Sequence, residues 1–226
     1  MTAAKPAWTP GRMYFQLDAD DEAYVLAGSS AYSGAALAAD TAALGDPAVM
    51  MIAREQYAFM RFLAAHGRCR RALDVGTFTG MSAQALAEGV GKTAKVITID
   101  RDEQWLEAAT RNWQAAKVAE RIEFRSGEAL DELAALADGE PFDLIFLDVD
   151  KANTTAYVEM SLKLLAPQGV IVVDNTLWHG WVLDPERDDA DTVGMRDFNA
   201  RIVNDPRVET VMVPIADGIM LIRRRD

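Results

Sequence analysis

Residues 145–153 read IFLDVDKAN, so an apolar run is followed directly by two acids and a lysine. An apolar run of this length is typical of a β-strand that is buried on both faces. Charged side chains at the end of such a strand cost free energy unless another charge or a ligand compensates them. The stretch therefore indicates either a structural ion pair or a functional site at the end of a central strand.

The pattern of that strand recurs along the chain. Strand-like runs occupy residues 70–76, 94–100, 121–127, 142–150 and 170–175, and helix-like segments follow them at 81–90, 103–118, 129–139 and 155–169. Repeated strand and helix units predict a parallel sheet with helices on both faces. Residues 208–214 and 219–225 break the alternation, because they read as two strands joined by a tight turn. We therefore expect a doubly wound α/β fold, a mostly parallel seven-stranded sheet with a C-terminal antiparallel hairpin.

The N-terminal part has a different composition from the rest of the chain. Residues 1–45 are rich in alanine and small polar residues, with helix-compatible pieces at 21–28 and 34–44. An amphipathic helix is expected from Pro47, and Gly67 reads as its stop. We predict a helical appendage over residues 1–45 and a main domain over residues 46–226.

Composition excludes several classes of function. The 226 residues carry a net charge of −12, which would repel a nucleic acid over most of the surface. Cys69 is the only cysteine, so an internal disulfide and a cysteine-rich metal site are excluded. The N-terminus lacks the apolar core of a signal peptide, and no apolar run reaches the ~18 residues of a membrane span. We expect a cytoplasmic protein without a nucleic-acid or membrane partner.

The loop after the first strand reads DVGTFTG at residues 74–80. A dinucleotide-binding loop would have a third, central glycine, whereas here Asp74 adds a negative charge, which suits a cationic ligand without phosphate. Asp100 ends the second strand, 24 residues after Gly76, where a carboxylate can accept hydrogen bonds from ribose hydroxyls. Loop and acid together indicate S-adenosylmethionine, although the loop alone is also consistent with a plain strand-to-helix turn.

Oxygen-bearing side chains follow two later strands. Asp148 and Asp150 come at the end of the fourth strand, and Asp174 and Asn175 follow the fifth. If these strands are neighbours, Asp148, Asp174 and Asn175 converge at one edge of the pocket, and their oxygens suit Mg²⁺, with Ca²⁺ and Mn²⁺ as alternatives. In the structural alternative Asp148 pairs with Lys151 and Asp174 caps the next turn.

Several segments resemble one family, the metal-dependent class I O-methyltransferases of the catechol and caffeoyl-coenzyme A type, and especially its bacterial small-molecule branch. The segments run in family order from about residue 47, and the most specific are ALDVGTFTGMSAQALA (72–87), VITIDRD (96–102), FDLIFLDVDKAN (142–153), GVIVVDNTLWHGWV (169–182) and PIADGIMLIRR (214–224). The resemblance implies the Rossmann-like methyltransferase fold and a homodimer. It also implies that the N-terminal appendage lies near the acceptor site.

The resemblance also implies roles for individual residues. It places the S-adenosylmethionine site at Met51, Asp74, Gly76, Ser82, Asp100, Ala129, Asp148 and Asp150. It implies that the metal ligands are Asp148, Asp174 and Asn175. Lys151 is the candidate general base, and the acceptor is expected to contact Lys151, Asn175, Trp178 and His179, with Trp181 nearby. His179 is not expected to bind the metal, because hard ions prefer oxygen ligands.

Three departures from the family pattern concern the acceptor. Asp74 replaces a more usual Glu, Thr154 stands where related sequences have Tyr, and residues 33–44 lack a pattern of basic and acidic residues. We expect a divalent-metal-dependent O-methyltransferase that transfers a methyl group from S-adenosylmethionine to a hydroxyl of a catechol-like small molecule. The alternatives are a catalytically weak S-adenosylmethionine-binding protein and a nucleotide-cofactor dehydrogenase. The sequence leaves open the acceptor, the methylated position and the physiological ion.

Overall fold

The computed structural model describes residues 19–29 and 33–225. The chain divides into two compact units, Met1–Ala31 and Tyr32–Asp226. In the first unit the described residues form α1 (Ala19–Gly28), close to the helix expected at residues 21–28. α2 (Ala35–Ala42) belongs to the larger unit. The role expected of residues 1–45 at the acceptor stays a prediction, and residues 1–18 lie outside the described part.

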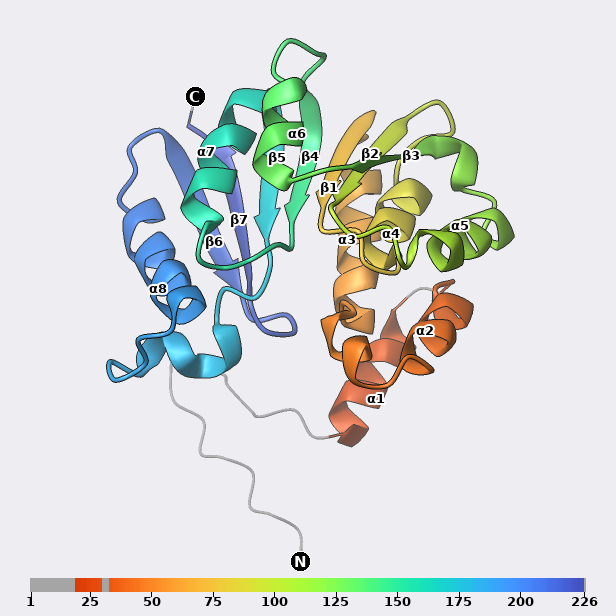
Figure 1. The fold of residues 1–226 in the computed structure, drawn as a ribbon, viewed down its shortest axis with the longest axis horizontal. Coiled ribbons are helices and arrows are strands. Elements are labelled where there is room, and N and C mark those ends of the chain that lie inside the picture. Colours follow the sequence, from red (N-terminus) through yellow and green to blue (C-terminus); the bar gives the residue numbers. More distant parts are fainter. Residues whose placement is uncertain (1–18, 30–32, 226) are drawn as a thin grey trace, which may run out of the picture. The chain divides into compact units, whose positions relative to one another are not determined.

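A seven-stranded sheet forms the centre of the larger unit. Its strands are β1 (Arg71–Val75), β2 (Lys95–Asp100), β3 (Ile122–Ser126), β4 (Phe142–Leu147), β5 (Leu165–Val173), β6 (Val208–Val213) and β7 (Ile219–Arg224). They lie in the order β3-β2-β1-β4-β5-β7-β6, as Figure 1 shows. The first five are parallel, while β7 is antiparallel to both β5 and β6. The predicted mostly parallel sheet with a C-terminal hairpin is therefore confirmed.

Helices cover both faces of this sheet. They are α3 (Arg54–His66), α4 (Met81–Gly89), α5 (Leu106–Ala115), α6 (Ala129–Ala135), α7 (Thr154–Leu164) and α8 (Ala190–Ile202), with short 3₁₀ turns η1 (Asp46–Met50), η2 (Ala119–Arg121) and η3 (Trp178–Leu183). Successive strand residues point to opposite faces. In β4 Leu144 and Phe146 pack in one core with α3, α4 and α5, whereas Ile145 and Leu147 pack in the other with α6, α7 and α8 (Figure 1). This double burial explains the continuous apolar runs.

Some expected boundaries are wrong. The helix expected over residues 155–169 ends at Leu164, and β5 begins at Leu165. Pro167 explains the early end, because proline has no N–H for the helical hydrogen bond and disfavours helical backbone at the preceding residue. The helix expected from Pro47 is divided into η1 and α3, since the backbone is extended at Ala53 (ψ 157°). β4 stops at Leu147, so the acids that follow it stand in a loop.

α8 was not expected from the sequence, which left residues 183–207 unassigned. The Asp189 carboxylate caps this helix by accepting a hydrogen bond from the Thr192 backbone N–H at 3.0 Å. Met195, Phe198 and Ile202 point from it into the core beneath the sheet. The helix therefore lies beside α7 and η3, on the face of the sheet that α6 and α7 also cover (Figure 1).

The helices of the described part are short. The longest, α3 and α8, have 13 residues each, whereas a span needs about 20 apolar residues. Accordingly, none of the helices in residues 19–29 and 33–225 is long and apolar enough to cross a membrane.

Candidate active site

The strand order reverses between β1 and β4, the place where open α/β sheets bind ligands at the carboxyl ends of their strands. Gly76 directly follows β1 and has a φ of +104°. A Cβ atom at this residue would lie 1.9 Å from the Asp148 carbonyl oxygen. Only glycine permits this conformation and this approach. The glycine loop and the acidic loop after β4 are therefore in direct contact.

Asp74 stands at the base of the glycine loop and is fully buried, with 0% of its surface exposed. The Thr98 hydroxyl donates to its Oδ2 at 2.6 Å, while its Oδ1 has no hydrogen-bond partner among the described residues. Burial raises the pKa of Asp74 to about 7, although the hydroxyls of Thr98 and Ser82 oppose that rise. A buried carboxylate oxygen without a partner fits a ligand that carries a positive charge, such as an ammonium group.

Asp100 ends β2 on the other side of the glycine loop. Its Oδ2 accepts a hydrogen bond from the Phe78 N–H at 2.8 Å, and its Oδ1 accepts one from the Asp102 N–H at 3.0 Å. A carboxylate has about four acceptor positions, so both oxygens can accept further bonds. Phe78 also packs edge-on against Trp105, with ring centroids 5.7 Å apart. Asp100 therefore fixes the glycine loop, and its predicted contact with a ribose stays a prediction.

The other predicted donor-site residues lie at different depths. Ser82 is buried in the first turn of α4, and its hydroxyl acts on the Asp74 carboxylate. Met51 packs against the core that contains α3, and Ala129 packs against the core on the opposite face. The cofactor roles of Ser82, Met51 and Ala129 all stay predictions.

Asp148 and Asp174 directly follow Leu147 and Val173, which pair in the neighbouring strands β4 and β5. Asp174 is 3% exposed, and its N–H donates to the Leu147 carbonyl at 3.0 Å. Burial, together with the negative charge of Asp148, raises the pKa of Asp174 to about 7. Asn175 follows in a left-handed conformation (φ 55°), and its N–H donates to the Asp174 Oδ1 at 2.7 Å. The two acids therefore converge, as expected for neighbouring strands.

Lys151 supplies the positive charge beside this acid pair. Its Nζ donates to the Asp148 Oδ1 at 2.8 Å and lies 5.8 Å from the ring centroid of Trp178. The side chain is buried, with 6% of the residue exposed. The ion pair between Asp148 and Lys151, which the sequence offered as a structural alternative to a metal site, is thus present. An acid pair held in this way can also exchange its ammonium partner for another cation.

The described residues contain no cluster of three or more His, Cys, Asp or Glu side chains that could hold a metal ion. The candidate set is instead two carboxylates and the amide of Asn175. Its fit rests on Asp148 and Asp174, because burial and the negative charge of Asp148 raise the pKa of Asp174, and nearby positive charge stabilises such a carboxylate. Oxygen donors of this kind suit a hard divalent ion. The residues present therefore fit the predicted metal, and binding itself stays a prediction.

Asp150 accepts three hydrogen bonds from the residues that follow it. Its Oδ1 accepts hydrogen bonds from the Asn153 N–H and side-chain amide, at 3.2 and 2.7 Å, and its Oδ2 accepts one from the Tyr157 hydroxyl. These contacts fix the loop before α7. Thr154, in the first turn of that helix, is buried and donates to the Lys151 carbonyl at 2.9 Å. Contact between Asp150 and a cofactor remains a prediction.

An aromatic cluster follows the acid pair in η3. His179 contacts both Trp178 and Trp181, with ring centroids 5.2 and 4.8 Å away, and the two tryptophan rings lie 6.2 Å apart. The His179 N–H donates to the Asp217 Oδ1 at 2.8 Å, so the turn of the β6–β7 hairpin holds this loop. The guanidinium of Arg187 lies 4.0 Å from the Trp181 ring centroid. The cluster forms a wall beside Lys151, where the acceptor is expected.

Two polar residues at the site were missed in the sequence. Thr98 contacts Asp74 from inside the apolar strand β2, and Gln56, which is 1% exposed on α3, faces Asp174 and lowers its pKa. Each is a polar residue on an otherwise apolar face, since Tyr57 and Met60 neighbour Gln56 in the core. That exception to the apolar pattern is the signal that could have found them.

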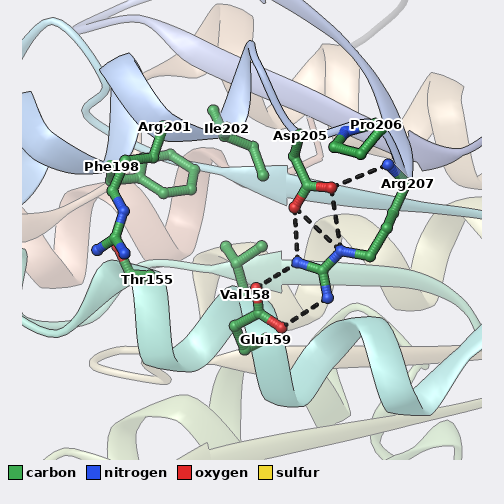
Figure 2. Close-up of a pocket in the computed structure, with 9 residues that line it drawn as sticks. All are labelled: Thr155, Val158, Glu159, Phe198, Arg201, Ile202, Asp205, Pro206 and Arg207. Carbon is green, nitrogen blue, oxygen red and sulfur yellow. Dashed lines mark hydrogen bonds and ion pairs between the residues drawn. The ribbon is translucent and has the colours of Figure 1, made fainter.

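A separate groove of about 380 Å³ lies between α7 and α8 (Figure 2). Its apolar wall includes Val158, Phe198 and Ile202. Arg207 closes one end by bonding to Glu159 at 3.0 Å and to Asp205 at 3.0 Å, as Figure 2 shows. None of the predicted site residues lines this groove. It is therefore distinct from the site at the β1–β4 switch.

Comparisons with known proteins agree with this geometry. The sequence pattern of the O-methyltransferase family matches residues 30–225. Catechol O-methyltransferase from Mycobacterium tuberculosis is 41% identical over 171 residues, 76% of each chain. Probable caffeoyl-CoA O-methyltransferase 1 from Dictyostelium discoideum is 33% identical over 180 residues, 78% of each chain. An O-methyltransferase from Bacillus cereus, solved in complex with S-adenosylhomocysteine, has a TM-score of 0.79 at 31% identity, covering 87% of this chain and 92% of that one. The chain therefore belongs to the O-methyltransferase family and is an S-adenosylmethionine-dependent transferase.

Proposed function

We propose that this chain is a divalent-metal-dependent O-methyltransferase that transfers a methyl group from S-adenosylmethionine to a hydroxyl of a catechol-like small molecule. One observation carries the proposal. The unpartnered buried oxygen of Asp74 and the acid pair Asp148 and Asp174 lie at the ends of three adjacent strands, β1, β4 and β5. The names of the relatives, a catechol and a caffeoyl-CoA O-methyltransferase, support the choice of acceptor.

The donor half of the site would hold S-adenosylmethionine. Asp74 Oδ1 would accept a hydrogen bond from the methionine ammonium, and Asp100 would accept hydrogen bonds from the ribose. Gly76 lets the loop after β4 approach the glycine loop, so the donor would contact both loops. Ser82 would complete the methionine end, with the predicted contacts of Met51, Ala129, Asp148 and Asp150 around it.

The acceptor half would hold the ion and the reacting oxygen. Asp148, Asp174 and Asn175 are the proposed metal ligands, for Mg²⁺ first and for Ca²⁺ or Mn²⁺ as alternatives. When bound, a divalent ion would act as a Lewis acid that lowers the pKa of an acceptor hydroxyl and orients two adjacent oxygens. The remaining steps belong to the protein's own side chains.

Lys151 is the proposed general base. It can accept a proton only as the neutral amine, and additional positive charge beside Asp148 would favour that form. Its Nζ already lies between Asp148 and the face of Trp178, so a phenol resting on that aromatic wall would present its proton to Lys151. Trp178, His179 and Asn175 would then orient the acceptor. Alignment of methyl group and oxygen can contribute ~7 to 11 kcal/mol to such a reaction.

A transfer assay tests this proposal. Radiolabelled S-adenosylmethionine is incubated with the protein, Mg²⁺ and a panel of catechols and monophenols, and S-adenosylhomocysteine binding is measured separately by calorimetry. We expect label in the catechols. S-adenosylhomocysteine binding without any transfer would instead indicate the catalytically weak binding protein.

The family resemblance also supports a cytoplasmic homodimer, and the net charge of −12 argues against a nucleic-acid partner. Light scattering at micromolar concentration tests the dimer, for which a mass of one chain would be the contrary result.

A further inference from the structure

α8 contacts the loop that carries Lys151. Asp191, in the first turn of this helix, accepts hydrogen bonds at one oxygen, Oδ1, from the backbone N–H groups of Lys151 at 3.1 Å and Ala152 at 2.9 Å. These two amides stand on either side of the Lys151 Cα atom. A single carboxylate oxygen thus fixes the backbone of Lys151 from both directions.

Close packing adds to this restraint. A Cβ atom at Gly194 would lie 2.6 Å from the Ala152 Cα and 2.7 Å from the Lys151 carbonyl oxygen, so the backbone of α8 rests directly on the loop. The same Lys151 carbonyl accepts the hydrogen bond from Thr154 at 2.9 Å. The N–H and the carbonyl of Lys151 are both held, and no further side chain fits between the loop and α8.

The second loop of the acceptor half is held by the same helix. The side-chain amide of Asn199 donates to the Thr176 carbonyl at 2.7 Å, one residue after Asn175. α8 therefore contacts both loops that carry the acceptor half, although it contributes none of the predicted reacting groups.

We propose that Asp191 is a positioning residue for Lys151: through Asp191, α8 sets the place where the Lys151 amine meets the proton of the acceptor. The inference rests on the proposed role of Lys151 as base. Proton transfer requires a heavy-atom distance of about 2.6 to 3.2 Å, and a displacement of about 1 Å can cost ~100-fold in rate. An anchored backbone is what keeps a long lysine side chain within that range.

Two substitutions separate position from charge. Asp191→Asn keeps an oxygen in place for both amides and removes the charge, whereas Asp191→Glu keeps the charge and moves the oxygen by one methylene group. We expect Asp191→Asn to keep kcat within about threefold, and Asp191→Glu and Asp191→Ala to lower it ~10- to 100-fold, with the KM for S-adenosylmethionine nearly unchanged. Asp197→Ala, an exposed position on the same helix, is the matched control. Full activity of Asp191→Glu with loss in Asp191→Asn would overturn the proposal.

A double-mutant cycle shows whether Asp191 acts through Lys151. Because Asp191 is proposed to act only by placing Lys151, Asp191→Ala should not lower kcat further in a Lys151→Ala background. An equal further loss in that background would overturn the proposal, and so would wild-type kcat in Asp191→Ala beside an impaired Lys151→Ala. Wild-type kcat in Lys151→Ala would instead overturn the role of Lys151 itself, and this proposal with it. S-adenosylhomocysteine binding by calorimetry verifies that each variant is folded.

Discussion

The two halves of the site differ in how their charges are compensated. In the donor half, Asp74 is fully buried, and one of its oxygens has no hydrogen-bond partner among the described residues. In the acceptor half, Asp148 already pairs with Lys151 at 2.8 Å. The donor half thus has an unfilled acceptor position shaped for a cationic ligand, whereas the acceptor half is compensated by its own lysine. A cation that binds there has to compete with an existing ion pair.

The largest effect is expected from the acceptor half. Asp148→Ala should abolish metal-dependent methyl transfer, a loss on the order of 10³-fold or more, because it removes a proposed metal ligand worth several kcal/mol in the transition state. The donor half should still bind S-adenosylhomocysteine. Parallel calorimetry and the radiolabel assay check both statements. Asp138→Ala, at an exposed position away from the site, is the control, and retained turnover in Asp148→Ala would contradict the assignment.

A substitution in the donor half should weaken binding of S-adenosylmethionine and leave metal binding intact. Asp74→Asn removes the charge that faces the unpartnered position, so affinity for S-adenosylmethionine should fall by ~10- to 100-fold, the value of a hydrogen bond between charged groups. Mg²⁺ affinity should stay nearly unchanged. Calorimetric titration with each ligand in turn measures the two affinities, and a comparable loss in both would show that the halves are not separate.

Metal binding in the acceptor half should depend on pH. Without an ion, burial and Asp148 raise the pKa of Asp174 to about 7, so an ion must displace a proton from Asp174 below that pH. Apparent Mg²⁺ affinity should therefore fall roughly tenfold between pH 8 and pH 6. Calorimetry in two buffers of different ionisation enthalpy would detect the released proton. An affinity that is constant over this range would contradict the prediction.

The same shift affects stability. The folded state holds the protons of Asp74 and Asp174 more tightly than the unfolded chain, since both pKa values are raised to about 7. The raised pKa values therefore add to the free energy of unfolding at acidic pH, below the pKa of an unfolded carboxyl. This contribution is lost as pH rises through 7. Mg²⁺ should raise the melting temperature more at pH 8 than at pH 6. Equal gains at both pH values would argue that Asp174 is not a ligand.

The smallest effect is expected from Thr98, which supports Asp74 by a hydrogen bond of 2.6 Å. Thr98→Val should raise the KM for S-adenosylmethionine about fivefold, the loss of roughly 1 kcal/mol from one hydrogen bond. kcat should change little, because the acceptor half is untouched. Thr93→Val, in an exposed turn, provides the matched comparison. A large fall in kcat would mean that Thr98 acts on more than donor binding.

The sheet could be predicted from the sequence because its signals are local. Five apolar runs and a hairpin turn predicted the strands. The proximity of Asp148 and Asp174 then followed from the adjacency of β4 and β5. The contact between Asp191 and Lys151 joins residues 40 positions apart. The hydrophobic periodicity of the sequence does not indicate such a contact, since the contact depends on how α8 packs after the sheet has formed.

α8 itself was missed although its signals were present. Asp189 is an N-cap residue, and Met195, Phe198 and Ile202 recur at helical spacing. The turn at Trp178, His179 and Gly180, with φ of 46°, 57° and 78°, is a different case. Left-handed backbone at tryptophan and histidine runs against their own preferences. It is held by contacts with Asp217 of the β6–β7 hairpin, which local sequence does not encode.

The metal dependence of methyl transfer decides whether the acceptor half works as proposed. The protein is treated with EDTA and desalted, and the initial rate of label transfer to a catechol is measured while Mg²⁺ is titrated back at pH 8. We predict that EDTA abolishes transfer and that Mg²⁺ restores it along a saturable curve, with no restoration in Asp148→Ala. Transfer that proceeds at full rate in EDTA would contradict the account of the acceptor half.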